Sequence, residues 1–573
     1  MFKKLKHSRG RYSISTTPII DPDEVLLDAS NLPNFDVSQF EGRFEKPIGK
    51  GTLYVTLSFL VVVIAVFSFK AWMIMIRDGS VYAIRSEKNR LHQTIIFPQR
   101  GVIEDRMGEK LAWNTLPEST TTEHALRVYT EKRGLAHVLG YVQYPAKDKS
   151  GFYYSDSFLG MDGVEKYYDE ILKGQNGVQT IETDVLGNIQ SSGIVRVPVD
   201  GKTVRLSIDA RINDKLYKEI ADVMSQYDYS SGAGIFMDVK TGEILAMADF
   251  PEYSSAIMSS GDDVNAIRRY NNNKQKPFLN RVVDGLYTPG STVKPFIALA
   301  ALTENIIDPN KRILSTGSIS IQNPYDPTKK SVFVDWKAHG WVDMREAIAV
   351  SSDVYFYEVG GGFEDQPGLG ITKIDKYLNL FGFGTTTGSG FFYGPSGVLP
   401  NPAWKAEHFT DKTWRLGDTY NTSIGQYGVQ VTPLQMARAV ASIANDGKLL
   451  TPRITPVDDQ DSIESVDLPI SHNSFQIVRE GMRQVITSGM ASGLKLGDRV
   501  KVAAKTGTAQ VSFVKDYVNS WVIGFFPYDN PKYAFAVVME SGPFNVPGGV
   551  HVAGAVIDWM TTYLPEYTPD KLN

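Results

Sequence analysis

The sequence contains no cysteine among its 573 residues. Without a thiol, the protein has no thiol nucleophile, no cysteine-ligated zinc, no iron–sulfur cluster and no disulfide. The His-Glu-x-x-His motif of many zinc hydrolases is also missing. The net charge is only −5, which argues against a large basic surface for nucleic acid. Hydrophobic residues make up 42% and charged residues 21% of the chain, so disorder of the whole chain is excluded.

One long stretch, residues 51–69, carries no charge, and an apolar run resumes after Lys70 and reaches residue 76. A helix of this length extends about 28 Å, close to the thickness of a bilayer core. The stretch begins too late in the chain, and is too long, for a signal peptide. A buried helix of a soluble domain is the other interpretation. We predict one transmembrane helix at residues 51–76, after a largely disordered tail at residues 1–50.

Basic residues occur on both sides of this segment, within residues 3–11 and 70–90, so the positive-inside rule does not decide its orientation. From residue 201 onward the pattern of strands and helices becomes regular. We predict a strand at 204–209, a helix at 212–227, and strands at 233–238, 244–248, 520–526 and 533–540. The turn at 240–243 is typical of a hairpin. These elements indicate an α/β or α+β domain with one central antiparallel sheet.

Ser291 and Lys294 form a Ser-x-x-Lys motif at the expected start of a helix. Pro289 and Gly290 predict a turn, and the Ala/Leu-rich run at 297–302 predicts the helix. Residues three apart share a helix face, so the hydroxyl of Ser291 and the amine of Lys294 can meet. A serine needs an adjacent base to act as a nucleophile, and a lysine of lowered pKa can be that base. Taken alone, the motif is more often a plain helix N-cap.

Two further motifs follow along the chain. Ser351 and Asp353 form a Ser-x-Asp motif, and Lys505, Thr506 and Gly507 form a Lys-Thr-Gly motif on a strand of small residues. Taken singly, each motif is more commonly a turn or a solvated charge. The three motifs in this order are typical of the penicilloyl-serine enzymes.

With these motifs the sequence resembles the class B penicillin-binding proteins, which are peptidoglycan D,D-transpeptidases. Residues 100–112 are similar to that family's Arg-Gly-x-Ile-x-Asp-Arg-x-Gly strand, and further similar segments lie at 137–142, 163–168, 174–177, 423–426 and 432–437. The resemblance implies an α+β fold with a transmembrane helix (51–76), an elongated, mostly β pedestal (77–200) and a transpeptidase domain (201–573). That last domain would resemble the serine β-lactamases, with helices on both sides of its sheet.

The resemblance also implies a role for each motif residue. Ser291 would be acylated by the penultimate D-Ala of a stem peptide, and Lys294 would be the general base. Ser351 would relay a proton to the leaving D-Ala and later from the incoming amine. Lys505 would set the electrostatics of this network.

The Lys-Thr-Gly strand would bind the donor. Thr506 and Thr508, with Gly507 between them, would hold its terminal carboxylate, and the backbone N–H groups of Ser291 and Thr508 would form the oxyanion hole. No metal or cofactor is implied. β-Lactams, as mimics of D-Ala-D-Ala, should acylate Ser291.

Three features depart from the family pattern. Asp353 stands where many relatives have Asn, and an ionised Asp353 would favour a protonated Lys294, so its protonation state is open. Residues 426–428 are Gln-Tyr-Gly where the family usually has Gln-Gly, which we interpret as a loop variant. About twenty residues separate Asn114 from His137, so the head of the pedestal, and any partner that docks there, is expected to be reduced.

Residues 400–405 and 414–421 resemble the elongation branch, the type 2 penicillin-binding proteins. A division-specific transpeptidase is the alternative, followed by a β-lactamase or β-lactam sensor and a non-catalytic cell-wall scaffold. The chain before residue 200 has no room for a glycosyltransferase domain. The resemblance therefore implies a SEDS-type glycosyltransferase as membrane partner, a cytoplasmic tail, and a catalytic domain outside the cytoplasmic membrane. No nucleic-acid partner is expected.

Overall fold

The computed structural model describes residues 49–82, 91–116, 123–149, 153–183, 189–323, 326, 328–388, 390–457, 463–487, 491–497, 499–511 and 517–567. The tail predicted at residues 1–50 lies almost wholly outside these ranges. The chain divides into two compact units, residues 1–90 and residues 91–573, which are described separately.

The first unit contains the predicted apolar helix. Helix α1 spans Lys50–Trp72 and continues through a π-helical turn at Met73–Arg77. The helix has a mean hydropathy of 2.5 in its most apolar window, and none of that window is buried in the protein. An apolar helix that buries none of its side chains among the described residues matches a membrane span better than the core of a soluble domain. The prediction of a single N-terminal apolar helix is confirmed.

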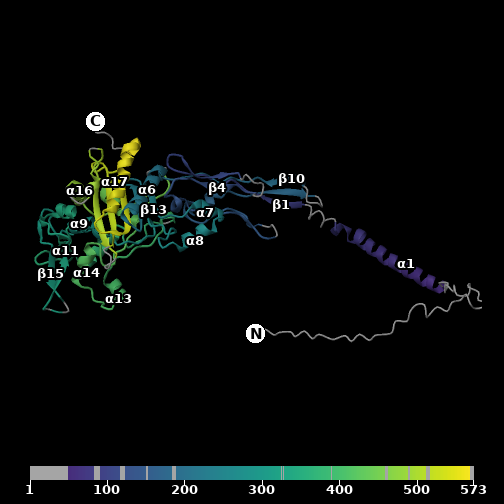
Figure 1. Ribbon diagram of the computed structural model, residues 1–573, viewed down its shortest axis with the longest axis horizontal. Helices are drawn as coiled ribbons and strands as arrows, with labels where there is room; N and C mark the ends of the chain where they lie inside the picture. Colours follow the sequence, from purple (N-terminus) through teal and green to yellow (C-terminus); the bar gives the residue numbers. More distant parts are fainter. Residues whose placement is uncertain are drawn as a thin grey trace, which may run out of the picture. The chain divides into compact units, whose positions relative to one another are not determined.

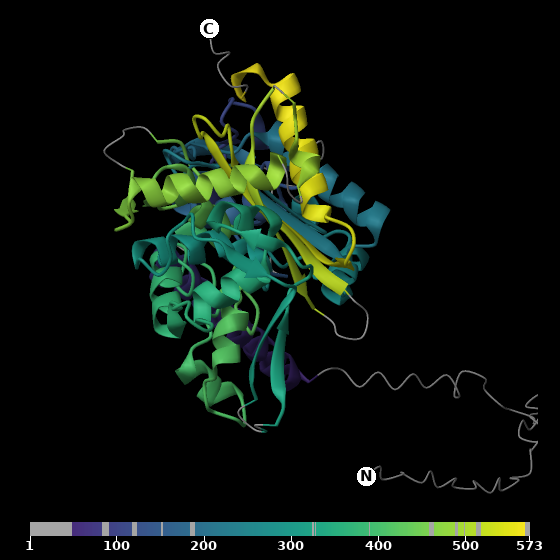
Figure 2. The same ribbon diagram turned by 90° about the vertical axis from the view of Figure 1, so that its left-hand side faces the viewer.

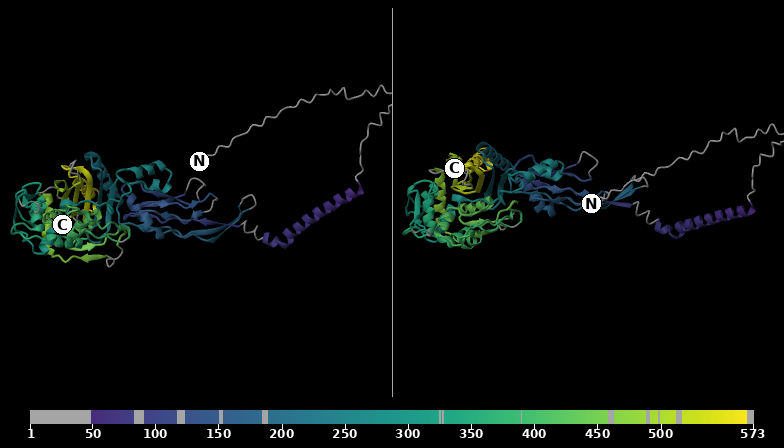
Figure 3. Two further views of the ribbon diagram at one scale, coloured as in Figure 1. Left: turned by 90° about the horizontal axis from the view of Figure 1, so that it is seen from below. Right: turned by 60° about the horizontal axis from the view of Figure 1, so that its bottom comes forward.

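The second unit begins with two small sheets and short helices. Figure 3 shows these strands, in blue, at one side of the unit and the green and yellow elements at the other. A three-stranded antiparallel sheet has the order β1 (Leu91–Ile96), β9 (Gly177–Thr183), β10 (Ile189–Arg196), and a four-stranded sheet has the order β11 (Val204–Arg205), β2 (Ile103–Glu104), β3 (Lys110–Thr115), β4 (Leu126–Tyr129). The remaining pieces are α3 (Ala136–Leu139), β5 (Val142–Gln143), β6 (Ala146–Lys147), β7 (Tyr153–Ser155), β8 (Leu159–Gly160), α4 (Gly163–Tyr167) and α5 (Asp169–Leu172).

A buried charge cluster joins these pieces. The carboxylate of Glu165 on α4 accepts a hydrogen bond from Arg100 Nε at 2.6 Å and from Arg127 Nε at 2.7 Å. All three side chains are fully buried. Arg100 also donates to Asp169 at 2.7 Å, and Arg127 donates to Asn114 at 3.2 Å. Because a buried charge is stable only when paired, this cluster ties the short helices to the strands.

The C-terminal part of the unit is built on a five-stranded antiparallel sheet. Its order is β13 (Ile244–Phe250), β12 (Ser231–Asp238), β22 (Tyr533–Pro543), β21 (Tyr517–Phe526), β20 (Ala503–Gln510). The predicted hairpins are β12–β13 and β21–β22, and β12 pairs with β22 to join the two ends of the region. The strands are buried almost throughout because helices cover both faces.

Helices α6 (Ala210–Tyr227) and α17 (Gly548–Tyr563) pack together on one face of this sheet (Figures 1 and 2). On the other side α15 (Pro433–Ala444) contacts the central strands, and α16 (His472–Thr487) lies beside it and against β20. The further helices are α7 (Ser255–Ser260), α8 (Val264–Asn272), α9 (Lys294–Thr303), α10 (Met344–Val350), α11 (Asp353–Gly361), α12 (Gly370–Leu380), α13 (Pro402–His408) and α14 (Leu416–Ser423). The short strand pairs are β14 (Ile313–Ser315) with β17 (Gly340–Val342), β15 (Ser318–Gln322) with β16 (Lys330–Val334), and β18 (Lys448–Leu450) with β19 (Ser465–Asp467). The α+β prediction with one central antiparallel sheet and helices on both sides is confirmed.

The strand predicted at residues 204–209 is wrong in extent. Only Val204–Arg205 forms a strand, and it pairs in parallel with β2 rather than with the central sheet. The next backbone N–H groups bond to three different segments, Leu206 to Glu104, Ser207 to Ile454 and Asp209 to Leu245. Alternation of side chains predicts an extended chain, but a strand also needs one continuous partner, which this segment lacks.

Glu252, just after β13, links the C-terminal part to the loop before α3. Its carboxylate accepts hydrogen bonds from the backbone N–H groups of Gly134 at 2.7 Å and Ala136 at 2.9 Å. Burial raises the pKa of Glu252 to about 7, against the lowering effect of these two hydrogen bonds. In the unfolded chain the carboxyl ionises near its ordinary value of 4.5.

Stability is therefore expected to depend on pH through Glu252. Between about pH 4.5 and 7 the folded state holds a proton that the unfolded state has lost, so the Glu252 contribution to folding stability falls as pH rises through this window, by about 2 to 3 kcal/mol. In Glu252→Gln this fall should disappear, so the difference in melting temperature between variant and wild type should move in favour of the variant from pH 5 to pH 8. Melting followed by intrinsic fluorescence in detergent measures it. Parallel curves for the two proteins would contradict the role of Glu252.

Candidate active site

Ser291 lies in a tight turn that leads into a buried helix. Gly290–Val293 form a 3₁₀ turn and α9 continues from Lys294, with Pro295 in the first helical turn, where its missing N–H costs nothing. Gly290 has a φ of +55°, and a Cβ there would lie 2.9 Å from the carbonyl oxygen of Thr508. The glycine thus permits both the left-handed conformation and the close approach of β20 to the serine.

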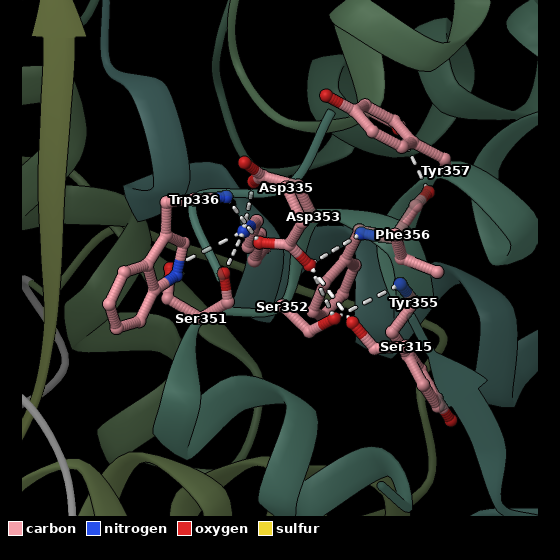
Figure 4. Close-up of polar contacts among 12 residues, drawn as sticks. Ser315, Asp335, Trp336, Ser351, Ser352, Asp353, Tyr355, Phe356 and Tyr357 are labelled. Carbon is pink, nitrogen blue, oxygen red and sulfur yellow. Dashed lines mark hydrogen bonds and ion pairs between the residues drawn. The ribbon is translucent and has the colours of Figure 1, made fainter. Parts of the chain in front are cut away.

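Ser351 and Asp353 come from the junction of two helices. Helix α10 ends at Ser351, which has a left-handed φ of +59°, and Ser352 caps the N-terminus of α11. The junction therefore turns sharply at Ser351 and presents Ser351 and Asp353 to the amine of Lys294 (Figure 4 shows the junction).

Lys294 is fully buried, and its amine is bonded in three directions. It donates to Ser351 O at 2.7 Å, to Asp353 Oδ1 at 2.6 Å and to Ser351 Oγ at 3.3 Å. An ammonium group has three N–H donors, so this arrangement suits a charged Lys294 beside an ionised Asp353. Within the described ranges Ser291 Oγ makes no hydrogen bond, and the direct contact between Ser291 and Lys294 stays a prediction.

Lys505 on β20 completes the cluster. Its amine donates to Ser351 Oγ at 2.8 Å and to Thr506 O at 2.8 Å, and its side chain is fully buried. Burial, and then the nearby charge of Lys294, lowers the pKa of Lys505 well below its ordinary value, and Asp353 opposes this. The two lysines that share Ser351 therefore differ in their surroundings: Lys294 pairs with the carboxylate of Asp353, whereas burial lowers the pKa of Lys505.

The cluster opens into a cleft of about 600 Å³. The residues that line the cleft include Ser291, Ser351, Asp353, Gln426, Thr506, Gly507 and Thr508. Thr506 and Thr508 alternate with buried neighbours on β20, so both side chains lie on the strand's cleft face. The three motifs, far apart in sequence, thus meet at one cleft. Groups of three or more His, Cys, Asp and Glu side chains that could hold a metal are absent from the described residues.

Asp335 and Trp336, between β16 and β17, line the same cleft and were missed by the sequence analysis. The side chain of Asp335 is buried, whereas Trp336 is 51% exposed. No sequence signal marks Asp335, because the groups that it contacts come from β14 and α11.

The Gln-Tyr-Gly variant is also explained locally. Tyr427 adopts a left-handed φ of +59° and stacks on Phe409 with ring centroids 5.7 Å apart, which places the extra residue in an aromatic cluster.

The charge of Asp353 should control the pH dependence of acylation. A carboxylate stabilises nearby ammonium groups, so Asp353→Asn is expected to lower the pKa of Lys505 further and to move the acid limb of the acylation rate toward lower pH. The second-order rate constant for a chromogenic β-lactam, measured from pH 5 to 10, tests this. Asp262→Asn, an exposed aspartate outside the cleft, is the control. A shift toward higher pH in Asp353→Asn would contradict the electrostatic argument.

Known proteins match the chain along most of its length. The penicillin-binding protein dimerisation domain matches residues 114–206, and the penicillin binding protein transpeptidase domain matches residues 232–558. The peptidoglycan D,D-transpeptidase MrdA of Haemophilus influenzae is 29% identical, over 87% of this chain and 79% of that protein. MrdA of Salmonella typhimurium is 31% identical, over 74% of this chain and 70% of that protein. The structure of PBP2 from Helicobacter pylori in complex with MreC has a TM-score of 0.66 at 27% identity, over 83% of this chain and 99% of that one.

The fold and the serine–lysine cluster define a penicilloyl-serine acyl-transfer enzyme, and the matched domains assign it to a family: the chain belongs to the class B penicillin-binding proteins. Within that class it is of the penicillin-binding protein 2 type, the MrdA peptidoglycan D,D-transpeptidases. The family and branch expected from the sequence are confirmed.

Proposed function

We propose that Ser291 is the nucleophile of a peptidoglycan cross-linking reaction. Its Oγ attacks the carbonyl of the penultimate D-Ala of a stem peptide, the D-Ala–D-Ala bond breaks, and the terminal D-Ala leaves as a free amine. An amine of a second stem peptide then attacks the acyl-enzyme and restores the Ser291 hydroxyl. The observation that carries this proposal is the buried Lys294–Ser351–Lys505 cluster on the wall of the cleft that Ser291 also lines.

We assign the proton transfers to the same cluster. Lys294 must lose a proton before it can accept one from Ser291, and the carboxylate of Asp353, 2.6 Å away, is the acceptor in contact. Ser351 Oγ, which lies between the amines of Lys294 and Lys505, passes the proton on to the leaving D-Ala nitrogen. Lys505 donates a hydrogen bond to Ser351 Oγ and so orients this hydroxyl for proton transfer. Because its pKa is lowered, Lys505 does so without adding a full second positive charge.

The strand β20 is proposed to bind the donor. The hydroxyls of Thr506 and Thr508 hold its terminal carboxylate, and the backbone N–H groups of Ser291 and Thr508, beside Gly507, stabilise the oxyanion. Each oxyanion-hole donor contributes about 3 kcal/mol in comparable enzymes. β-Lactams, which carry an equivalent acyl group and carboxylate, acylate the same serine.

We further propose that the enzyme acts in cell elongation. Labelling of membranes with a fluorescent penicillin tests the acyl-transfer step, because a stable adduct supports a transpeptidase, whereas rapid turnover with hydrolysed antibiotic supports a β-lactamase. Depletion of the protein tests the biological role. Cells should become round, whereas filaments would assign the protein to division and overturn the elongation proposal.

The catalytic unit is proposed to lie outside the cytoplasmic membrane, with α1 as its single anchor. A chain without cysteine offers a direct test. Ser192→Cys, at an exposed position of β10, should react with a membrane-impermeant maleimide in intact spheroplasts. Ser8→Cys in the tail should react only after lysis, and the reverse pattern would overturn the orientation.

Membrane partners are proposed on the same basis. Neither matched domain is a glycosyltransferase domain, so we propose a SEDS-type glycosyltransferase that contacts α1 and residues 91–206. The Helicobacter pylori relative was solved with MreC, and an MreC-like protein is a second proposed partner. Co-purification of each partner with the full-length chain in detergent, and its loss when α1 is replaced by an unrelated span, tests the first contact.

A further inference from the structure

Asp335 lies beneath the junction of α10 and α11, the element that carries Ser351 and Asp353. It follows β16, and its carboxylate is completely buried. A buried carboxylate is costly unless its oxygens accept several hydrogen bonds. Asp335 satisfies this condition with four donors from three separate segments.

The two oxygens of Asp335 accept hydrogen bonds on different sides: Oδ2 from the start of α11 and from β14, and Oδ1 from the cleft wall (Figure 4). Oδ2 accepts from Ser352 Oγ at 2.9 Å, from Val354 N at 3.0 Å and from Ser315 Oγ at 3.2 Å. Oδ1 accepts from the backbone N–H of Trp336 at 2.8 Å, and the imidazole of His339 lies 3.5 Å from it. The negative charge also lies at the N-terminus of α11, where the helix dipole favours it.

These contacts hold the backbone on both sides of Asp353. Ser352 precedes Asp353 and Val354 follows it, and both donate to the same oxygen of Asp335. Asp353 in turn accepts a hydrogen bond from the amine of Lys294, whose other hydrogen bonds are to Ser351. Asp335 therefore holds Asp353 in position through its two neighbours, without contacting Asp353 itself.

The conformation of the junction adds a reason for this support. Ser351 has a left-handed φ of +59°, which costs a non-glycine residue about 1 kcal/mol or more unless its surroundings impose it. With its backbone carbonyl and its hydroxyl both bonded to Lys294, a small rotation at Ser351 would displace two contacts at once. Anchoring Ser352 and Val354 prevents that rotation.

We propose that Asp335 is a positioning residue for acylation. It holds the α10–α11 junction so that Ser351 and Asp353 meet Lys294, and it holds the backbone of Trp336 at the cleft wall. This inference rests on the proposed function of Ser291 and assigns no chemical step to Asp335 itself. Loss of Asp335 slows acylation without removing the nucleophile.

The test is Asp335→Asn in the full-length chain, with a fluorescent penicillin as probe. The amide keeps the size of the side chain, but only its oxygen can accept hydrogen bonds. The variant therefore loses either the bonds from Ser352 and Val354 or the bond from the backbone N–H of Trp336. We expect an acylation rate constant about 30-fold lower, with an unchanged dissociation constant for the non-covalent complex and the same labelled fraction at completion.

The matched control is Asp209→Asn. Asp209 is also a buried carboxylate that caps a helix, α6, and its other partners are the guanidinium of Arg211 and the hydroxyl of Tyr567. It is not among the residues that line the cleft. The control variant should lose thermal stability and keep the wild-type rate constant. If the role of Asp335 is purely structural, Asp335→Asn should also keep the wild-type rate constant and should only lower the labelled fraction. That result would overturn the proposal.

Two further outcomes complete the test. If Asp335→Asn acylates within about threefold of wild type, the positioning role is wrong. If Asp335→Asn does not fold, Ser352→Ala decides, because it removes one donor to Asp335 and should slow acylation about fivefold. An unchanged rate constant in Ser352→Ala would then overturn the proposal. Retained labelling of Ser291→Ala would instead refute the proposed function, so the two failures are distinguishable.

Discussion

Replacement of Ser291 with alanine is expected to abolish covalent labelling by penicillin, a loss of more than about a thousandfold in the acylation rate. The alanine removes the one oxygen that can form the ester, and no thiol exists to substitute for it. The lysine cluster and the cleft remain, so the variant should still bind a β-lactam reversibly. Gel fluorescence of membranes that contain the full-length variant measures the covalent label, and equilibrium binding measures the reversible complex.

The control is Ser254→Ala. Ser254 caps the N-terminus of α7 through a hydrogen bond to Ile257 N, which is the ordinary role that the sequence also allowed for Ser291. Its loss should weaken a short helix and leave labelling intact. A covalent label on Ser291→Ala, located by mass spectrometry on another residue, would refute the assignment of the nucleophile.

The second large effect is expected at Glu165, far from the motifs in sequence. Glu165→Gln removes the carboxylate that the fully buried guanidinium groups of Arg100 and Arg127 share. Among the described residues this leaves Arg127 without an anionic partner and Arg100 with Asp169 alone. Arg100 Nη1 and Arg127 Nη2 already lack a hydrogen-bond partner within the described residues. Neither guanidinium group therefore has a spare acceptor that could replace Glu165. Breaking a buried ion pair costs about 3 to 5 kcal/mol, because an uncompensated charge stays behind.

The expected result is a large drop in melting temperature, or failure to accumulate folded protein. Differential scanning fluorimetry of the full-length chain in detergent measures the drop, and protease resistance at 37 °C measures the folded fraction. Glu170→Gln is the control, since Glu170 forms an exposed pair with Lys173 and exposed pairs contribute little. Equal melting temperatures for Glu165→Gln and Glu170→Gln would show that the cluster does not hold the short helices to the strands.

Much of the fold could be predicted because the signals were local. The apolar run of α1 is uninterrupted, and the hairpins β12–β13 and β21–β22 each lie within about thirty residues of sequence, where alternation and turn residues suffice. The segment after Val204 was predicted less well. Its alternating residues are extended, but three different segments pair with them, and no local pattern records that.

The site divides in the same way. Ser291, Ser351 and Lys505 were found because each belongs to a short motif, and the order of the three motifs led to the family resemblance. The structure adds the contacts between the motifs: Lys505 bonded to Ser351, Lys294 paired with Asp353, and a lowered pKa for Lys505. Asp335 has no motif, and its importance appears only with its four donors.

The sequence by itself determined the chemical class of this protein, because a Ser/Lys nucleophile, the lack of thiols and one apolar span are properties of residue types and near neighbours. Only the tertiary structure decided how Lys294, Lys505, Ser351 and Asp353 contact one another, and which buried carboxylates contact the junction of α10 and α11 and the N-terminal strands. The physical reason is that burial and charge pairing depend on distances of a few ångströms between segments that are as many as 154 residues apart, and such distances exist only in the folded chain.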